Sequence, residues 1–495
     1  MADTLAIGDP RRWAQEQFGD AKLGDKRRTS RLVQSAAMMA SNSSGSIPQQ
    51  MGDSPAMRAT YRLYSRDEVV HEAVCAPHFR RTREAASCGG VVLMVQDTSE
   101  LNFTSHKACK GLGPIGHGKG IRGLHQQNVL AVDGSTGLPL GLMLQTHHTR
   151  TERPAAKKVS SRTAARRIPK EERESHWWTA SIEKIGSPPA GTTWVHVGDR
   201  GEDFYGAFMA CIKTGTDWVI RAARSRCIET EHGPGDLFTV ARAQPAMGTR
   251  KVRLSRPRES GTEDKATGAA SGGRGRGRKA DTELVELHVS STRVRLMPPQ
   301  KDPAYVGAPP VDCFVVRAWE ANPPPGVAPL EWILLTSMPC EDVASTMRVV
   351  EFYAKRWLIE EFHKCEKTGC AVESRRLETR ERLEPLIGTL SVLAVCLLQL
   401  KMVARDNPEV PAKELFDDRM TKVMAAFLKC PAEGMTIGKF WTGIGRLGGH
   451  MGRKCDGPIG WLRAWKGWMA FRLLLQGAEL FERATQPWER QAEMG

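Results

Sequence analysis

The sequence of 495 residues has only 5 tyrosines, against 13 tryptophans, and no apolar run of membrane-spanning length. Its most apolar stretch, residues 386–400, contains Thr389 and Gln399 and falls short of the ~20 residues that cross a bilayer. The opening segment MADTLAIGDPRRW has no apolar core behind a basic flank, which argues against a signal or transit peptide. We therefore expect a cytoplasmic protein with no membrane partner, and a buried helix at residues 386–400.

Paired cysteines are also missing. The 12 cysteines are scattered singly and none forms a CxxC pair, while Cys365 and Cys370 stand at the end of an expected helix. This pattern predicts reduced thiols and argues against a zinc site or a disulfide framework.

An acidic balance is absent as well. Lys and Arg number 71 against 56 Asp and Glu, which gives a net charge of +15 and favours a polyanionic partner such as nucleic acid. Hydrophobic residues make up 40% and charged residues 26%, an ordinary globular composition that excludes wholesale disorder and a fibrous repeat. At ~150 residues per domain, the length suggests about three domains or one large enzyme core with additions.

Periodicity divides the chain into three parts. The first is basic and carries apolar residues at helical spacing over residues 13–32 and 54–64. The second alternates strands and helices, interrupted by a β-rich insertion, and the third is helical. The expected parts are residues 1–85, residues 86–370 with the insertion at about 224–329, and residues 371–495.

Within the second part, two apolar runs flank Asp-Gly-Ser-Thr-Gly at residues 133–137, which predicts an antiparallel hairpin. Residues 341–367 lack proline and glycine and predict one long helix. Residues 150–173 hold nine Lys or Arg against three acids and predict a mobile or nucleic-acid-facing excursion. The Gly-, Ser- and Arg-rich residues 259–279 have too little apolar area to order themselves.

A polar stripe marks the second half of the long helix. At 100° per residue its members fall within about 80° of one another. Such a stripe is normally a solvated face, but here bulky apolar residues crowd both sides, which favours a groove or a ligand. The stripe comprises Tyr353, Arg356, Glu360, Lys364 and Lys367.

Two acids end apolar strands, since Asp97 follows VVLMVQ and Asp199 follows TTWVHVG. A single Asp in such a place more often caps a turn or a helix. Carboxylates on neighbouring strands can also converge with one from a helix and bind divalent cations. Together with Glu360, the two acids favour a metal site that activates water and neutralises phosphate charge.

The order Tyr353, Arg356, Glu360 and Lys367, separated by two, three and six residues, resembles the Y-R-E-K signature of bacterial cut-and-paste DDE transposases of the insertion-sequence-four family. The segment YAKRWLIEEFHKCEKTG is similar to that family throughout. So are WAQEQFGDAKLGDKRRTSRLV, VQDTSELNF, DRGEDFYGAF and GRLGGHMGRKCDGPIGWLRAWKGW, which extends the resemblance over nearly the whole chain. Gly201 departs from the family, which usually has an acid after Asp-Arg, and this leaves open what supports Asp199.

The resemblance implies an α/β fold: a ribonuclease-H-like catalytic core with a β-rich insertion, an N-terminal helical DNA-binding domain and a C-terminal helical dimerisation domain. It implies Asp97, Asp199 and Glu360 as the catalytic, metal-binding triad, with two Mg²⁺ ions per active site for which Mn²⁺ can substitute. Expected DNA contacts are Tyr353, Arg356, Lys364 and Lys367 of the stripe, and Lys26, Arg27, Arg28 and Arg31 of the basic N-terminal segment.

Trp332 adds a further expected DNA contact. It stands 28 residues before Glu360 in LEWILLTS, where the family has a tryptophan that holds a flipped base. A tryptophan in an apolar strand is more often part of a core.

The implied reaction is cut-and-paste transposition. The enzyme binds terminal inverted repeats, nicks one strand, closes the end as a hairpin, reopens it and joins it to target DNA. The implied partners are double-stranded DNA and a second copy in a homodimeric synaptic complex, placed at the bacterial nucleoid. Dimer contacts are one expectation for four C-terminal tryptophans and core packing is the other; these are Trp441, Trp461, Trp465 and Trp468.

Two alternatives remain at this point: a host-acting nuclease or junction resolvase with the same core, and an inactive DNA-binding regulator. The GxGxxG match at residues 111–116 does not directly follow a strand, and the nearby P-loop-like run has Gly120 where Ser or Thr is needed. No nucleotide cofactor is therefore expected.

Overall fold

The computed structural model describes residues 9–116, 120–151, 169–255, 282–300, 302–323, 329–453 and 456–485. The stretch at residues 259–279, and most of that at residues 150–173, lies outside these residues. The chain divides into two compact units. The first comprises Met1–Ile220, Phe352–Met451 and Ile459–Gly495, and the second comprises Arg221–Glu351 and Gly452–Pro458. The expected boundaries at residues 85 and 370 both fall inside the first unit.

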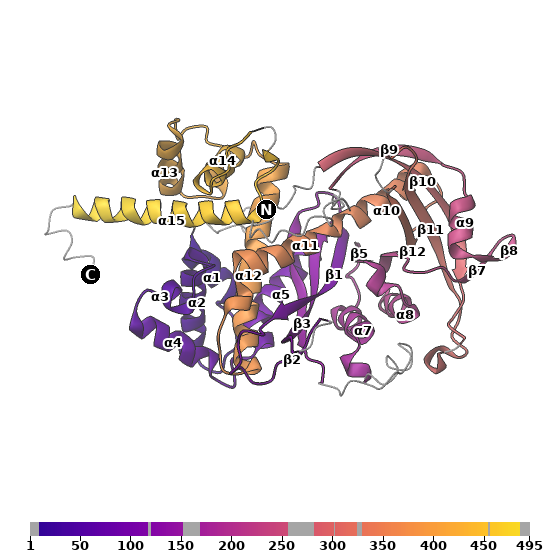
Figure 1. Cartoon of the computed structure of the whole chain (residues 1–495), viewed down its shortest axis with the longest axis horizontal. Coiled ribbons are helices and arrows are strands. Elements are labelled where there is room, and N and C mark those ends of the chain that lie inside the picture. The colour runs from indigo at the N-terminus through magenta and orange to yellow at the C-terminus, as the bar shows by residue number, and fades with distance from the viewer. Residues whose placement is uncertain are drawn as a thin grey trace, which may run out of the picture. The chain divides into compact units, whose positions relative to one another are not determined.

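Five helices form the N-terminal part of the first unit. Asp9, Asp25 and Asp53 each begin a helix by accepting hydrogen bonds from backbone N–H groups of its first turn. The helix expected at residues 54–64 is confirmed, but residues 13–32 form parts of two helices. The chain turns between them at Gly24, whose φ of 77° disfavours other residues. The helices are α1 (Pro10–Phe18), α2 (Lys26–Ser41), α3 (Ile47–Met51), α4 (Ser54–Tyr64) and α5 (His71–Ala85) (Figure 1).

A mixed sheet forms the centre of the first unit. Three strands are antiparallel neighbours: β1 (Gly90–Asn102), β3 (Arg122–Asp133) and β4 (Pro139–His148). Strands β5 (Thr192–Gly198) and β6 (Asp217–Arg221) continue the sheet in parallel, so its order is β4-β3-β1-β5-β6, and the short β2 (Gly113–Pro114) pairs with the start of β3. The hairpin expected around residues 133–137 is confirmed. Strand β1 reads as a continuous apolar run because it is central, and residues 92–95 are all buried.

Helices connect these strands. Helix α7 (Glu174–Ile185) precedes β5, and α8 (Tyr205–Thr214) lies between β5 and β6. In the second unit, the described residues form an antiparallel sheet, a short helix between its strands and most of α10 (Val343–Lys355), which agrees with the β-rich character expected there. Its elements are β7 (Cys227–Thr230), β8 (Gly233–Asp236), α9 (Leu237–Ala243), β9 (Gly248–Ser255), β10 (Thr282–Leu296), β11 (Val311–Glu320) and β12 (Glu331–Thr336).

The expectation of one continuous helix at residues 341–367 is wrong. The segment contains α10 (Val343–Lys355), α11 (Trp357–Lys364) and a π-helical turn, η6 (Cys365–Gly369). The helix tightens at Arg356, because the Arg356 amide bonds the Tyr353 carbonyl three residues back instead of the fourth. It then widens in η6, where the Cys370 amide bonds the Cys365 carbonyl. A spacing of 100° per residue therefore does not hold as far as Lys367.

Helix α12 (Arg380–Asp406) is long and apolar enough to cross a membrane, but 94% of its most apolar window is buried inside the protein. The buried helix expected at residues 386–400 is confirmed. Figure 1 shows α12 beside the N-terminal helices, and it contacts α2, α4 and α5. Helices α13 (Asp418–Leu428), α14 (Ile437–Leu447) and α15 (Trp461–Ala484) follow it. Single 3₁₀ turns are η3 (Lys170–Glu172), η4 (Arg200–Glu202), η5 (Pro303–Tyr305), η7 (Val372–Ser374) and η8 (Ala412–Glu414).

Three of the four C-terminal tryptophans belong to the core of this chain. Trp461, Trp465 and Trp468 are all buried, and Trp441 is half-buried. The ring of Trp468 packs against aromatic neighbours within its own chain. For the three buried tryptophans, core packing is therefore the better account.

Candidate active site

The pairing of β1 with β5 places the two predicted aspartates at the same level of the sheet. Val95 on β1 is the parallel partner of Val197 on β5. Asp97 and Asp199 each lie two residues further along, so both stand at one level of the two neighbouring strands. Asp199 also begins the turn η4, because its Oδ1 accepts a hydrogen bond from the Gly201 amide at 2.6 Å.

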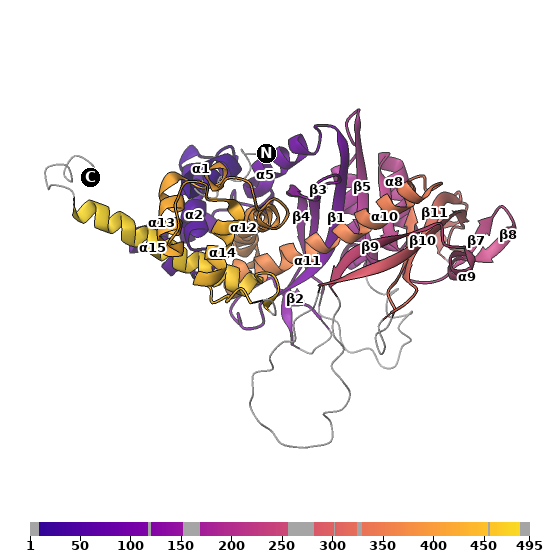
Figure 2. The same cartoon turned by 90° about the horizontal axis from the view of Figure 1, so that it is seen from above.

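Helix α11 brings the third predicted acid to β1, which it contacts (Figure 2). Arg356 links the helix to the strand. Its Nη2 lies 3.1 Å from Oε1 of Glu360, and its Nη1 lies 4.0 Å from Oδ2 of Asp97. The Nη1 atom is buried and makes no hydrogen bond to any residue that the structure describes. The guanidinium thus lies between the carboxylates of Asp97 and Glu360, and its Nη1 remains available to donate a hydrogen bond.

The charges of Asp199 and Glu360 also act on the carboxyl group of Asp97. Burial, with the nearby charges of Asp199 and Glu360, raises the pKa of Asp97 to about 7 even though the charge of Arg356 opposes the shift. A carboxyl group responds in this way when like charges crowd it. A bound cation would relieve this crowding and favour the ionised form of Asp97.

The described residues include no group of three His, Cys, Asp or Glu side chains close enough to hold a metal ion. The donor set nevertheless suits a hard divalent cation, since the side chains of Asp97, Asp199 and Glu360 offer only carboxylate oxygens. Arg356 occupies the space between two of them. We infer that a cation and this guanidinium compensate the same negative charge.

A fourth acid, Glu202, lies near Asp97 and Asp199 and was not among the predicted residues. It is fully buried, and Gln96, the neighbour of Asp97, donates a hydrogen bond to its Oε1. Burial raises the pKa of Glu202 well above its usual value. Gly198 makes room for this carboxyl, because a Cβ there would lie 1.7 Å from its Oε2.

Gly201 stands where the resembled family usually has an acid, one position before Glu202. Gly201 is exposed, and a Cβ there would lie 3.0 Å from the Asp199 carboxylate. An acid follows one position later in the chain, but the Glu202 carboxyl bonds Gln96, and the Asp199 carboxylate is held by the Gly201 amide. The signal was present in the sequence as the acid three residues after Asp199.

The other three residues of the stripe differ in exposure and surroundings, although a single helix face predicts that they share them. Tyr353 is only 5% exposed. Lys364 is exposed, pairs with Glu361 at 3.4 Å, and places its ammonium 4.1 Å from the centre of the Trp357 ring. Lys367 is half-buried and lies in η6. The structure thus joins Arg356 and Glu360 directly, whereas the other three have different surroundings.

Two tryptophans, one in each unit, differ in exposure. Trp332 is 8% exposed on β12 of the second unit, whereas Trp357 at the start of α11 is 46% exposed. A large exposed indole is unusual in a folded chain and is a candidate surface for base stacking. In the sequence, Trp357 is one of the bulky apolar residues beside the stripe, and only the structure reveals its exposure.

The basic N-terminal residues form an open hollow at the start of α2. It has a volume of about 430 Å³ and is lined by Lys26, Arg27, Ser30, Arg31 and Gln34. Arg28, expected to act with them, points elsewhere: its Nη1 bonds the Leu23 carbonyl and pairs with Glu68, both at close range. The structure therefore brings together three of the four predicted cations.

Carboxylates gathered on adjacent strands and a helix are typical of enzymes that act on phosphodiesters. Two family models match the chain: Transposase DNA-binding over residues 10–69, and Transposase DDE domain over residues 97–397. The second match covers more than half of the 495 residues, and the chain belongs to the DDE transposase family. It is a DNA transposase with its own DNA-binding domain, and its mixed α/β fold fits a ribonuclease-H-like core.

Proposed function

We propose that this transposase performs cut-and-paste transposition in the manner of the insertion-sequence-four family. It binds the terminal inverted repeats of its own element, nicks one strand, forms a hairpin on the element's end, reopens the hairpin and transfers the end to target DNA. The observation that carries the proposal is the common level of Asp97 and Asp199 on paired strands, with Glu360 linked to Asp97 through Arg356.

Mg²⁺ bound by Asp97, Asp199 and Glu360 would supply an activated water and charge neutralisation at the phosphate, two ions being the number we propose. The protein's own residues hold the substrate. Arg356 turns its unused Nη1 edge to a phosphate oxygen, for which a guanidinium is geometrically suited. Lys367 and Lys364 add positive charge along the same segment.

End recognition is assigned to α2. Lys26, Arg27 and Arg31 line a hollow at the surface, where they can contact adjacent phosphates and form no ion pair with another described residue. The residues belong to the segment matched by the Transposase DNA-binding family, which supports this assignment.

A homodimer is part of the proposal. Helix α15 exposes large apolar side chains to water. Exposed apolar patches of this kind mark interaction surfaces, and we propose that a second copy of the chain covers this one. Three of them are Leu473, Leu480 and Phe481, which are 66%, 65% and 70% exposed.

The decisive experiment is footprinting on DNA that flanks the protein's own gene, followed by cleavage of the protected duplex in Mg²⁺. We expect protected inverted repeats on both sides and, on a denaturing gel, a nicked product followed by a hairpin. Cleavage of branched junctions without repeat protection would identify a resolvase. Repeat protection without any cleavage in Mg²⁺ or Mn²⁺ would identify a regulator.

A further inference from the structure

Buried polar side chains lie beneath the candidate site in the first unit. Asn128 on β3 is the register partner of Asp97 on β1. The Nδ2 of Asn128 lies 3.1 Å from Nε2 of His363, which follows Glu360 by three residues on α11. One side-chain hydrogen bond thus joins the strand opposite Asp97 to the helix that carries Glu360.

The same helical segment is tied to the sheet a second time, through Glu366. Glu366 is fully buried, and its Oε2 accepts a hydrogen bond from Gln126 at 2.8 Å while its Oε1 accepts one from Ser391 at 2.5 Å. Gln145 on β4 donates to Asn128 at 2.8 Å and lies 3.0 Å from the Ser391 hydroxyl. We name this set the polar bridge; its members are Gln126, Asn128, Gln145, His363, Glu366 and Ser391.

The protonation of His363 is consistent with its place in the bridge. Burial lowers the pKa of His363 to about 3, with help from the charges of Lys367 and Arg356, so the ring is neutral. Because the Asn128 amide nitrogen can only donate, Nε2 of His363 accepts and Nδ1 carries the proton. The hydrogen bond therefore has a defined direction.

Apolar side chains alone could also attach α11 to the sheet. They would carry no risk of leaving a buried polar group without a partner, which costs about 1–3 kcal/mol of stability for each group. Hydrogen bonds add a constraint on distance and angle that apolar packing lacks. Metal ligands need such a constraint, because a site works only when its ligands are held within roughly 0.5 Å. The polar bridge supplies this constraint on distance and angle between the strand that pairs with β1 and the helix that carries Glu360.

We propose that the polar bridge positions Glu360 relative to Asp97 for metal binding, with His363 and Asn128 as its central positioning residues. The inference rests on the proposed function, because it assumes that these carboxylates bind divalent cations. It adds that residues which touch neither metal nor DNA set the affinity of the site.

The test compares His363→Leu with His363→Gln. The Gln side chain offers an oxygen acceptor to Asn128, whereas Leu fills the space without one. Mn²⁺ affinity is measured by electron paramagnetic resonance on the full chain without DNA, and unfolding temperature is measured alongside. We expect His363→Leu to weaken Mn²⁺ binding by roughly 10-fold, the lower end of the effect of removing a direct partner of a metal ligand, because His363 acts on Glu360 only through the position of α11. His363→Gln should retain most of the affinity, even if it is the less stable variant.

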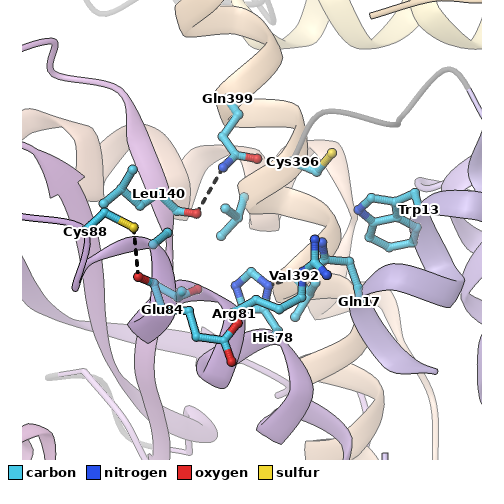
Figure 3. A pocket seen from close by; sticks show the side chains of 13 residues that line it. Trp13, Gln17, His78, Arg81, Glu84, Cys88, Leu140, Val392, Cys396 and Gln399 are labelled. Carbon is cyan, nitrogen blue, oxygen red and sulfur yellow. Dashed lines mark hydrogen bonds between the residues drawn. The ribbon is translucent and has the colours of Figure 1, made fainter. Parts of the chain in front are cut away.

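Gln399→Leu is the matched control. Gln399 is also a buried amide that ties a helix to this sheet, donating to the carbonyls of Pro139 at 2.9 Å and Leu140 at 3.2 Å, and Figure 3 shows the second of these bonds. Its hydrogen bonds to these two carbonyls do not involve the polar bridge. Removing the amide should lower the unfolding temperature and leave Mn²⁺ affinity unchanged.

The outcomes separate the two levels of the proposal. If the wild-type chain does not bind Mn²⁺, or if Asp97→Asn binds it equally well, the proposed metal chemistry fails and this inference fails with it. If the wild-type chain binds Mn²⁺ through Asp97 but the two His363 variants bind it equally, only the inference is overturned. Should His363→Leu not fold, Asn128→Ala removes the same hydrogen bond and carries the same expectation.

Discussion

Basic side chains on two helices of the first unit stand in opposite electrostatic settings. On α2, Lys26, Arg27 and Arg31 line an open hollow and form no ion pair with a residue that the structure describes. On α11, the side chain of Arg356 is 16% exposed and lies between the carboxylates of Asp97 and Glu360. The α2 cations are available to any polyanion, whereas the charge of Arg356 is already shared with two carboxylates. We infer that α2 supplies affinity and α11 supplies chemistry.

The largest expected effect comes from a substitution in the candidate active site that leaves α2 unchanged. Asp97→Asn removes a charge that compensates the proposed metal but leaves the α2 hollow intact. We expect nicking of an end duplex in Mg²⁺ to fall by roughly a thousandfold or more, with end binding within about twofold of wild type. Gel-based cleavage and mobility-shift assays on the same duplex measure the two quantities. Full cleavage by this variant would show that the α11 site is not catalytic.

The second prediction concerns the basic residues of α2. Neutralising Lys26, Arg27 and Arg31 to Gln should lower the slope of log affinity against log salt by about 0.9 for each phosphate that is no longer neutralised, or about 2.7 in total. The control is Arg28→Gln, because Arg28 is already engaged with Glu68. Titrations of end DNA at several salt concentrations give both slopes. Equal slopes for the triple variant and wild type would place end recognition outside α2.

A third prediction concerns the two tryptophans. Trp357→Ala removes a ring that is 46% exposed, so we expect little change in stability and a roughly tenfold slower hairpin step, from a stacking energy of about 1–3 kcal/mol. Trp332→Ala empties a site that is only 8% exposed and should lower the free energy of unfolding by about 3–5 kcal/mol.

Chemical denaturation and single-turnover hairpin assays distinguish the two tryptophans. A stable Trp332→Ala with intact nicking and a selective hairpin defect would support the flipped-base role expected for Trp332. A joint failure of nicking and hairpin formation in Trp357→Ala would assign Trp357 to general DNA binding.

The smallest effect concerns pH and the buried end of the α11 segment. Burial raises the pKa of Glu366 from its ordinary value of 4.5 to about 7, so the folded state holds its proton more tightly than the unfolded chain. Its contribution to stability is fully present below about pH 4.5 and disappears as pH rises through 7, with a slope of at most about 1.4 kcal/mol per pH unit. Glu366→Gln should remove that slope. The difference in unfolding free energy between the two proteins from pH 5 to 8 isolates it, and a constant difference would show that Glu366 does not titrate there.

Much of the fold followed from local patterns. The hairpin at residues 133–137, the helix at residues 54–64 and the buried helix at residues 386–400 each have a short-range signal that the tertiary structure did not override. The long helix at residues 341–367 failed, because its tightening at Arg356 and its widening in η6 have no such signal. Lys367 consequently left the face on which a regular helix would place it.

The candidate site shows the same division. Residue types and spacing, read with the family resemblance, were enough to propose Asp97, Asp199 and Glu360, because hard-metal chemistry needs acids at strand ends and on a neighbouring helix. Sequence alone did not distinguish Arg28 from its three basic neighbours, or Trp332 from Trp357, since exposure depends on which distant segment covers a side chain. The roles of His363 and Asn128 became visible only when β3 and α11 were placed together. The hydrogen bond between them joins residues 235 positions apart in the chain, and no local pattern carries that information.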